Sequence, residues 1–355
     1  PIVEEAIKRG YNHYIICRGY RNNRGYNLRQ VFPFADKVMK ALTAIPIFID
    51  KDFPAENIKN YIFEYFAIKR IKNLEGYPII HSWDFLPNLY RSIKERNSGI
   101  KIIQDVPMAL PSILNERERL YLWGRRDIEI PSYITASFPY INSFVVPSNF
   151  VKRSLIKEGI DKDKIFVVPF GVDINRFKPV EKDYSGTFKV AFSGNVNLRK
   201  GIPFLIKAWK ELKLEDAQLN IYGIVYPEVK KYLTDREKYN IRVHGFLRDI
   251  DRELPKNHIY VFPSILEGSA KSTYEAMACG LPVITTENSG SIVEDGREGF
   301  IIPTLDVESI KEKILFFYEN REKIKEFGER ARKKVEMYTW GEYGRNIVDI
   351  YELIS

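Results

Sequence analysis

The chain of 355 residues is long enough for two domains, since a domain averages roughly 150 residues. Its residues are 45% hydrophobic and 14% aromatic, which excludes a disordered chain. The excess of 55 Lys and Arg over 47 Asp and Glu gives a net charge of +8, which fits either a mixed-charge surface or an anionic partner. The longest nearly apolar run, residues 41–49, is far shorter than the roughly 18 residues of a membrane-spanning helix. Two distant cysteines without a C-x-x-C pair exclude a disulfide framework and a zinc ribbon.

The first half of the chain alternates strand-like and helical patterns after an opening helix at Pro1–Arg9. Apolar runs predict strands at Tyr14–Cys17, Ile45–Ile49, Pro78–His81, Ile100–Ile103, Ser143–Val146 and Ile165–Val168. Between them, helices are predicted at Glu56–Lys72, Leu86–Glu95 and Phe150–Glu158. A Rossmann-like domain should open with a strand and a glycine-rich turn, and neither precedes Pro1. We therefore expect the usual first strand to be absent.

A second alternating series follows a linker rich in proline and glycine at residues 169–179. Its predicted strands are Phe188–Ser193, Leu219–Tyr222, Arg242–Gly245, Ile259–Phe262, Val283–Thr286 and Gly299–Ile302. Apolar spacings of three and four predict helices from Val307 and over Trp340–Ser355. The whole pattern predicts an α/β protein of two doubly wound parallel-sheet domains, residues 1–172 and 173–337, followed by a helix in residues 338–355.

The segment from Pro263 to Gly280 is the densest in candidate chemistry. Glu267 and Gly268 follow a buried strand, and ligands of open α/β sheets bind at the carboxyl ends of strands. A helix is predicted to begin near Lys271 and to end at Gly280. The backbone amides of Ser269 to Thr273 would therefore form an anion site at a helix N-terminus.

Glu275 lies inside this helix among apolar and small neighbours, so its carboxylate needs a partner. That partner is either a structural one, such as an arginine or a backbone amide, or a polar ligand with hydroxyl groups. The position beside the strand ends favours the ligand.

A second polar loop, residues 194–201, also follows a predicted strand. Arg199 offers a bidentate fork and Lys200 a point charge, a pair that suits a diphosphate, although such a pair at a helix start is often only solvated. The segment matches neither a Walker loop nor G-x-G-x-x-G, so those nucleotide-binding classes lack support.

Together these segments resemble the retaining glycosyltransferases of family 4, which have the GT-B fold. The resemblance rests on the loop from Gly194 to Gly201, on Glu267 and Glu275 with seven residues between them, and on Gly280-Leu281-Pro282. It extends to Glu294-Asp295-Gly296 with Gly299, to Gly171-Val172-Asp173 with Phe177 and Pro179, and to Tyr338-Thr339-Trp340. It implies two Rossmann-like domains with a cleft between them and a C-terminal helix that crosses back to the first domain.

The resemblance implies a nucleotide-sugar donor, such as a UDP- or GDP-sugar, held by the second domain, and an acceptor held by the first. Arg199 and Lys200 would neutralise the diphosphate, Glu275 would accept the ribose hydroxyls, and Glu267 would hold the transferred sugar. Backbone atoms of Gly245 and Phe246 would lie near the nucleobase. The candidate donor-binding residues are Gly194, Asn195, Arg199, Lys200, Gly245, Phe246, Glu267, Gly268, Ser269, Ala270, Lys271, Ser272, Thr273 and Glu275. The resemblance further implies retention of configuration on a hexose-type sugar, with no metal and no cofactor.

The chain departs from the family pattern at two further places. Asn195 stands where many relatives have arginine, and Arg199 could reach the same phosphates. Relatives often have histidine after the strand that corresponds to Ile100–Ile103, where this chain has Gln104-Asp105. Asp105 would either orient an acceptor hydroxyl or cap a turn. Together with Glu267, which would hold the transferred sugar, Asp105 is a candidate catalytic residue. His81, at another strand end, is a candidate acceptor contact or a structural residue.

The acceptor side is less well defined by the residues. Basic and aromatic residues interleave in two segments, Arg18–Arg29, which we interpret as a loop, and Arg117–Arg126. Such a mixture suits either a solvated face or an anionic phospholipid surface. We expect a lipid-linked or phosphorylated acceptor, no nucleic acid, and a cytoplasmic protein, peripheral on the inner face of the membrane if the acceptor is a lipid. The composition, rich in Ile, Lys, Glu and Tyr, also indicates a thermophile.

Two alternatives stay open from the sequence. One is a nucleotide-sugar epimerase of the same fold, and the other is a non-catalytic nucleotide-sugar-binding protein. The four histidines lack metal-ligand spacing, and the D-x-D pairs Asp50-x-Asp52, Asp161-x-Asp163 and Asp249-x-Asp251 are expected to be solvated turn residues. The nucleobase, the sugar and the acceptor are not specified.

Overall fold

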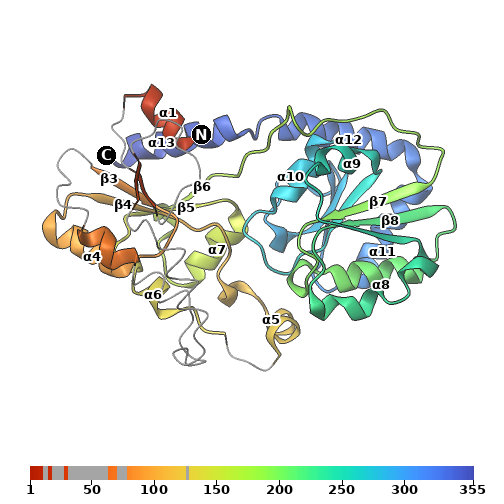
Figure 1. The fold of residues 1–355 in the computed structure, drawn as a ribbon, viewed down its shortest axis with the longest axis horizontal. Coiled ribbons are helices and arrows are strands. Elements are labelled where there is room, and N and C mark those ends of the chain that lie inside the picture. The colour runs from red at the N-terminus through yellow and green to blue at the C-terminus, as the bar shows by residue number, and fades with distance from the viewer. Residues whose placement is uncertain (11–14, 18–27, 31–62, 70–77, 125–127) are drawn as a thin grey trace.

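The structure, a computed structural model, describes residues 1–10, 15–17, 28–30, 63–69, 78–124 and 128–355. Two α/β domains lie side by side, each built on a parallel sheet with helices packed against it (Figure 1). The prediction of two doubly wound parallel-sheet domains is therefore confirmed. Among the described helices, none combines the length and the hydropathy that crossing a membrane requires.

The N-terminal domain contains a four-stranded sheet in the order β3-β4-β5-β6. Its strands are β3 (Ile79–Ser82), β4 (Lys101–Asp105), β5 (Ser143–Val146) and β6 (Ile165–Val167). A separate parallel pair joins β1 (Ile15–Cys17) to β2 (Leu28–Gln30). The helices are α1 (Ile2–Lys8), a helical stretch at residues 63–69, α4 (Pro87–Arg96), α5 (Glu116–Trp123), α6 (Ser132–Thr135) and α7 (Asn149–Lys157).

The C-terminal domain contains a six-stranded sheet in the order β12-β11-β10-β7-β8-β9. Its strands are β7 (Phe188–Ser193), β8 (Ala217–Tyr222), β9 (Ile241–Gly245), β10 (Ile259–Phe262), β11 (Val283–Thr286) and β12 (Gly299–Ile302). The helices around it are α8 (Ile202–Leu212), α9 (Ile250–Glu253), α10 (Lys271–Ala278), α11 (Val307–Glu319) and α12 (Arg321–Val335). The central strands β8, β10 and β11 are buried along their whole length, as expected of a sheet covered on both faces.

The strand order fixes where a ligand can bind in this domain. From β7 the chain adds β8 and β9 on one side, and then returns to add β10, β11 and β12 on the other. The direction of winding therefore reverses between β7 and β10, and open α/β sheets bind ligands beyond the carboxyl ends of the strands at such a switch point. Figure 1 shows the loops of this region on the side that faces the N-terminal domain.

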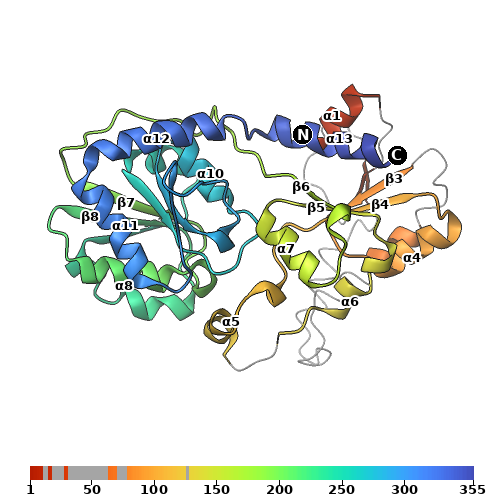
Figure 2. The same cartoon turned by 180° about the vertical axis from the view of Figure 1, so that it is seen from behind.

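The C-terminal helix α13 (Trp340–Ile354) crosses back to the N-terminal domain, as the resemblance implied. Thr339 caps it by accepting a hydrogen bond from the amide of Glu342 (3.1 Å). Its buried side chains, among them Ile347 and Tyr351, pack with Ile103 and Val145 of the N-terminal sheet. Seen from behind, α13 continues the line of α12 and reaches α1, beside which both chain ends lie (Figure 2).

Most predicted strands match the structure within two residues, and one segment differs. Residues 28–30, interpreted from sequence as part of a loop, form β2, in which Arg29 pairs with Ile16 of β1. That interpretation was wrong because a strand of three residues is too short to show the alternation of apolar and polar residues by which a strand is predicted from sequence. The strand predicted at Ile45–Ile49 lies outside the described residues, as do His13, Arg18, Arg21, Arg24, Arg125 and Arg126.

Candidate functional site

The two polar loops predicted from sequence meet at the switch point. The first follows β7 and turns through the short 3-10 helix Leu198–Lys200, where the side chain of Asn197 accepts a hydrogen bond from the amide of Lys200 (3.1 Å). The second follows β10 and carries Glu267. Gly201 has φ of 68°, and a Cβ there would collide with the Pro263 carbonyl, so glycine lets the two loops approach each other.

Arg199 and Lys200 both contact the carboxylate of Glu267. Arg199 Nη1 donates to Glu267 Oε1 at 2.7 Å, and the ammonium of Lys200 pairs with the same oxygen. Glu267 is buried, with 7% of its surface exposed. Burial lowers the pKa of Lys200, the charge of Glu267 opposes that change, and the charge of Arg199 adds to it. The cluster carries two cations for one carboxylate, so it retains a positive charge that can receive an anion.

The N-terminus of α10 offers fewer free amides than the sequence predicted. The amide of Ala270 donates to the Ser289 carbonyl (2.9 Å), and that of Thr273 donates to the Ala270 carbonyl (2.9 Å). The prediction that every amide from Ser269 to Thr273 faces a ligand was therefore wrong at these two positions. The hydroxyl of Ser269 donates to the Gly290 carbonyl (2.9 Å), which ties this turn to the loop after β11.

Glu275 lies one turn into α10, where the charges of two cations act on its carboxylate. Burial raises its pKa to about 7, while Arg176 and Lys271 lower it and Asp251 raises it. The structural alternative is therefore represented by nearby charge, chiefly that of Arg176, and the polar ligand that the sequence favoured stays a prediction. A carboxylate with this pKa changes its charge near neutral pH, which makes anything that it binds sensitive to pH.

Gly245 ends β9 and Phe246 follows it, so both lie at the same edge of the parallel sheet as the switch-point loops. Gly245 has φ of 70°, and its carbonyl accepts a hydrogen bond from the amide of Gly223 (2.7 Å). The side chain of Phe246 is 70% exposed, which is unusual for a large apolar residue. An exposed ring at a strand end is available to stack on a planar ligand.

Loops of the N-terminal domain meet this site directly. Ser148 Oγ donates to the Gly268 carbonyl at 2.5 Å, and the amide of Ala109 donates to the Glu267 carbonyl at 3.3 Å. A Cβ on Gly268 would collide with the Pro107 carbonyl. Glu267 and Gly268 therefore belong to the C-terminal domain and are also held by the N-terminal domain.

Helix α5 forms a second contact between the domains, which the sequence analysis did not identify. Glu118 is buried, and its Oε1 accepts hydrogen bonds from Asn288 Nδ2 (2.9 Å) and Thr304 Oγ1 (2.6 Å). The ring of Tyr121 lies 4.9 Å from that of Phe204. The capping box of Asn115 and Glu118 was readable from sequence, but the second role of Glu118 depends on residues more than 150 positions away.

His81 and Asp105 lie together at the ends of β3 and β4, beneath α13. His81 Nε2 is 2.7 Å from Asp105 Oδ2, and His81 Nδ1 is 2.6 Å from the hydroxyl of Tyr351. Asp105 is 4% exposed, and its charge raises the pKa of Tyr343 and Tyr351 beyond the effect of burial. The structure thus joins the two residues in a network with the crossover helix, and their predicted role toward an acceptor stays a prediction.

The D-x-D pairs that the structure describes differ in their partners. Asp161 accepts a hydrogen bond from the amide of Asp163 (3.0 Å), as expected of a turn residue. Asp251 instead lies in α9 and pairs with Arg176, 75 residues away (2.7 Å), so the prediction of a solvated turn residue was wrong for Asp251. Asp50 and Asp52 lie outside the described residues. Within the part of the chain that the structure describes, no three or more His, Cys, Asp and Glu side chains are grouped so as to hold a metal ion.

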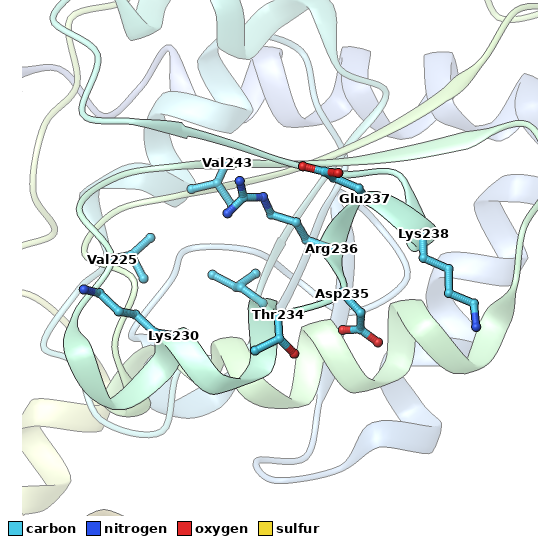
Figure 3. Close-up of a pocket in the computed structure, with 9 residues that line it drawn as sticks. Val225, Lys230, Thr234, Asp235, Arg236, Glu237, Lys238 and Val243 are labelled. Atoms are coloured by element: carbon cyan, nitrogen blue, oxygen red, sulfur yellow. The ribbon is translucent and has the colours of Figure 1, made fainter.

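A pocket of about 530 Å³ reaches the loop of residues 194–201, since its lining residue Val225 forms a β-bridge with Val196 of that loop (Figure 3). It is lined by Val225 and Val243 and by charged residues that include Lys230, Arg236 and Glu237. None of the candidate catalytic, donor-binding or acceptor residues named from the sequence lines this pocket.

The fold and the site together define a class. Two parallel-sheet domains, a crossover helix and a charged switch-point site that both domains contact are the architecture of GT-B glycosyltransferases. The chain belongs to the family 4, or group 1, glycosyltransferases: residues 2–176 match the family model described as Glycosyltransferase Family 4, and residues 173–334 match Glycosyl transferases group 1.

Individual relatives agree with this assignment. The chain is 30% identical to a probable sucrose-phosphate synthase of Thermosipho melanesiensis over 207 residues, which are 54% of this chain and 48% of the relative. It spans about half the length of the curated relatives that it matches first. Two solved structures share the fold. Sucrose-phosphate synthase from Thermosynechococcus elongatus has a TM-score of 0.71 at 15% identity, covering 99% of this chain and 91% of its own. HepE of Anabaena in complex with UDP has a TM-score of 0.68 at 15% identity, covering 92% and 91%.

Proposed function

We propose that this protein is a retaining glycosyltransferase that moves a hexose-type sugar from a nucleotide-sugar donor to an acceptor on the N-terminal domain. The observation that carries the proposal is the convergence of Arg199 and Lys200 on Glu267 at the switch point. A diphosphate would compete with the Glu267 carboxylate for these two cations, because charge-assisted contacts to a more highly charged anion are stronger. The solved complexes of HepE with UDP and with UDP-glucose support a donor of this class.

In the proposed reaction, the bond between the anomeric carbon and the diphosphate oxygen breaks, and its electron pair leaves with the diphosphate. Arg199 and Lys200 stabilise the charge that develops there, a strong effect inside a partly buried site. Glu267, freed from the cations, accepts hydrogen bonds from sugar hydroxyls. The acceptor oxygen bonds to the same face of the anomeric carbon, and its proton passes to the leaving phosphate oxygen. No metal or cofactor takes part.

The anomeric form of the released sugar tests this proposal. Incubated with UDP-glucose or GDP-mannose without acceptor, the protein should slowly transfer the sugar to water, and proton NMR at the first time points should show the α-anomer of the released sugar. Initial release of the β-anomer would contradict retention. Conversion of the donor into an epimeric nucleotide sugar would instead favour the epimerase, and UDP or GDP binding without turnover on any acceptor would favour a binding protein.

We also propose that the acceptor is anionic, either phosphorylated or lipid-linked. Arg117, Arg119 and Leu120 are exposed on α5, at the side of the N-terminal domain that contacts the donor site. Cations beside an exposed apolar residue suit a phospholipid surface.

The lipid form of this proposal predicts binding to vesicles of phosphatidylglycerol at low salt and none to phosphatidylcholine vesicles. Exchanging Arg117 and Arg119 for glutamate should weaken binding by about 30-fold or more, since each lost cation near an anionic surface contributes on the order of 1 kcal/mol and about 1.4 kcal/mol is a factor of ten. Equal sedimentation with both kinds of vesicle would contradict an electrostatic membrane contact and leave the phosphorylated soluble acceptor.

A further inference from the structure

Arg176, which no sequence argument singled out, holds the loop that follows β9. Its Nη2 donates to the Arg248 carbonyl at 2.8 Å, and both Nε (3.0 Å) and Nη2 (2.7 Å) donate to Asp251 Oδ1. Arg248 lies two residues after Phe246, and Asp251 lies in α9. The guanidinium therefore fixes the distal end of the loop that carries the exposed Phe246 ring.

The backbone of Arg176 is itself fixed on the C-terminal domain. Its amide donates to the Asp173 side chain (3.0 Å), and the next residue, Phe177, is buried in the core of that domain. Arg332 of α12 donates to the carbonyls of Ile174 and Phe177, at 3.3 and 2.9 Å. Because the residues on both sides are anchored, Arg176 is a rigid point from which the loop is held.

Arg176 also provides the charge that acts most favourably on Glu275. The groups that act on this carboxylate are Arg176 from the linker, Lys271 from its own helix and Asp251 from α9, and it acts in turn on Tyr260 of β10 and on Cys279. Arg176 favours the ionised carboxylate more than Lys271 does, and Asp251 disfavours it. The guanidinium thus acts on both the Phe246 loop and Glu275, the two features of the C-terminal domain that would meet the nucleoside.

We propose that Arg176 is a positioning residue for the nucleoside half of the donor site, which fixes the Phe246 loop and places a compensating positive charge beside Glu275. The inference rests on the proposed function, since it deepens the role of that site. Arg176 need not touch the ligand, because its three hydrogen bonds are already made within the protein. A lost guanidinium should therefore weaken recognition of the nucleoside and leave recognition of the diphosphate intact.

The test is calorimetric titration with UDP, GDP and inorganic diphosphate between pH 5.5 and 8.5, on the parent, Arg176→Ala, Arg176→Lys and a control, Arg345→Ala. Arg345 is a matched control because it is a similarly exposed arginine paired with one carboxylate, Glu342 in α13. The ionised form of Glu275 accepts ribose hydroxyls, so nucleotide affinity of the parent should fall as the pH drops through about 7. Inorganic diphosphate has no ribose, and it corrects for titration of the phosphates themselves.

Arg176→Ala should raise the Kd of the bound nucleotide by about fivefold or more at pH 7, because the Phe246 loop loses its anchor and the pH midpoint of binding moves upward. The Kd of inorganic diphosphate should stay within about twofold. Arg176→Lys keeps the positive charge but loses the guanidinium that bonds the Arg248 carbonyl and Asp251. Its nucleotide affinity should therefore have the same pH midpoint as the parent and stay weaker than that of the parent.

Three outcomes would overturn the inference. Arg176→Ala could match Arg345→Ala in affinity and midpoint, or it could weaken diphosphate as much as nucleotide. In either case the proposed donor site would survive. If the parent bound neither UDP nor GDP at any pH, the donor site itself would be wrong, and the role of Arg176 with it. Should Arg176→Ala fail to fold, the affinities of Arg176→Lys decide: a nucleotide affinity equal to that of the parent would overturn the inference.

Discussion

Replacing Lys200 with alanine is expected to weaken the binding of UDP or GDP by about 10- to 100-fold. A charge-assisted contact contributes about 1.5–3 kcal/mol, and every 1.4 kcal/mol is about a factor of ten in affinity. The ammonium of Lys200 is largely buried and contacts Glu267, so no neighbouring lysine can take its place by moving through solvent. Arg199→Ala should act in the same direction, and the double variant should lose more than either single one.

Calorimetry measures these affinities, with Lys207→Ala as the control. Lys207 lies on the adjacent helix α8, is 65% exposed, and pairs only distantly with Glu211 (3.9 Å). Its loss should change affinity by less than about twofold, because exposed ion pairs contribute little. Parent-like affinity in the double variant would show that these two cations do not hold the diphosphate.

Replacing Gly268 with alanine is expected to reduce transfer activity by about 100-fold while the protein stays folded. The new Cβ would collide with the Pro107 carbonyl of the other domain, so the two domains must separate at the site. Misplacement of reacting groups by about 1 Å can cost about 100-fold in rate. Each domain keeps its own core, so we expect the melting temperature to fall by only a few degrees.

Steady-state kinetics and thermal melting together measure this effect. The control is Gly341→Ala, because a Cβ on Gly341 meets its nearest neighbours at 3.6 and 3.8 Å, an ordinary contact distance. Nucleotide affinity of Gly268→Ala should change far less than its turnover, since Arg199, Lys200 and Glu275 all belong to the C-terminal domain. Unchanged turnover would mean that the contact at Pro107 is not part of the active arrangement.

The sheets were predictable because their strands are continuous apolar runs between glycine, proline and polar residues. Runs of this kind at β5, β7, β10, β11 and β12 correspond residue for residue to the predicted strands. The site was predictable to the extent that it follows strand ends, since parallel strands place their carboxyl ends at one edge of a sheet. The loops with Arg199, Lys200 and Glu267 meet for that reason.

Contacts between distant segments were not predictable from one sequence. The pairing of Arg199 and Lys200 with Glu267, rather than with solvent, depends on a loop that is 67 residues away. His81 and Asp105 were noted separately, but nothing local indicates that Tyr351 of α13 lies against them. Arg176 sits in a segment that reads as a linker, and only the folded position of the β9 loop gives it a function. At α10, the predicted helix start indicated free backbone amides, but the amide of Ala270 donates a hydrogen bond to the Ser289 carbonyl in the loop after β11.

The central claim is that the C-terminal domain binds a nucleoside diphosphate through its switch-point loops without a metal. A thermal-shift panel of UDP, GDP, ADP, CMP and TDP, each with and without magnesium, tests it most directly. We expect one nucleoside diphosphate to raise the melting temperature in a concentration-dependent way, equally with and without the metal, and Lys200→Ala to require about 10- to 100-fold more nucleotide for the same shift. A panel in which no nucleotide shifts the melting temperature, or in which the shift requires magnesium, would contradict the claim.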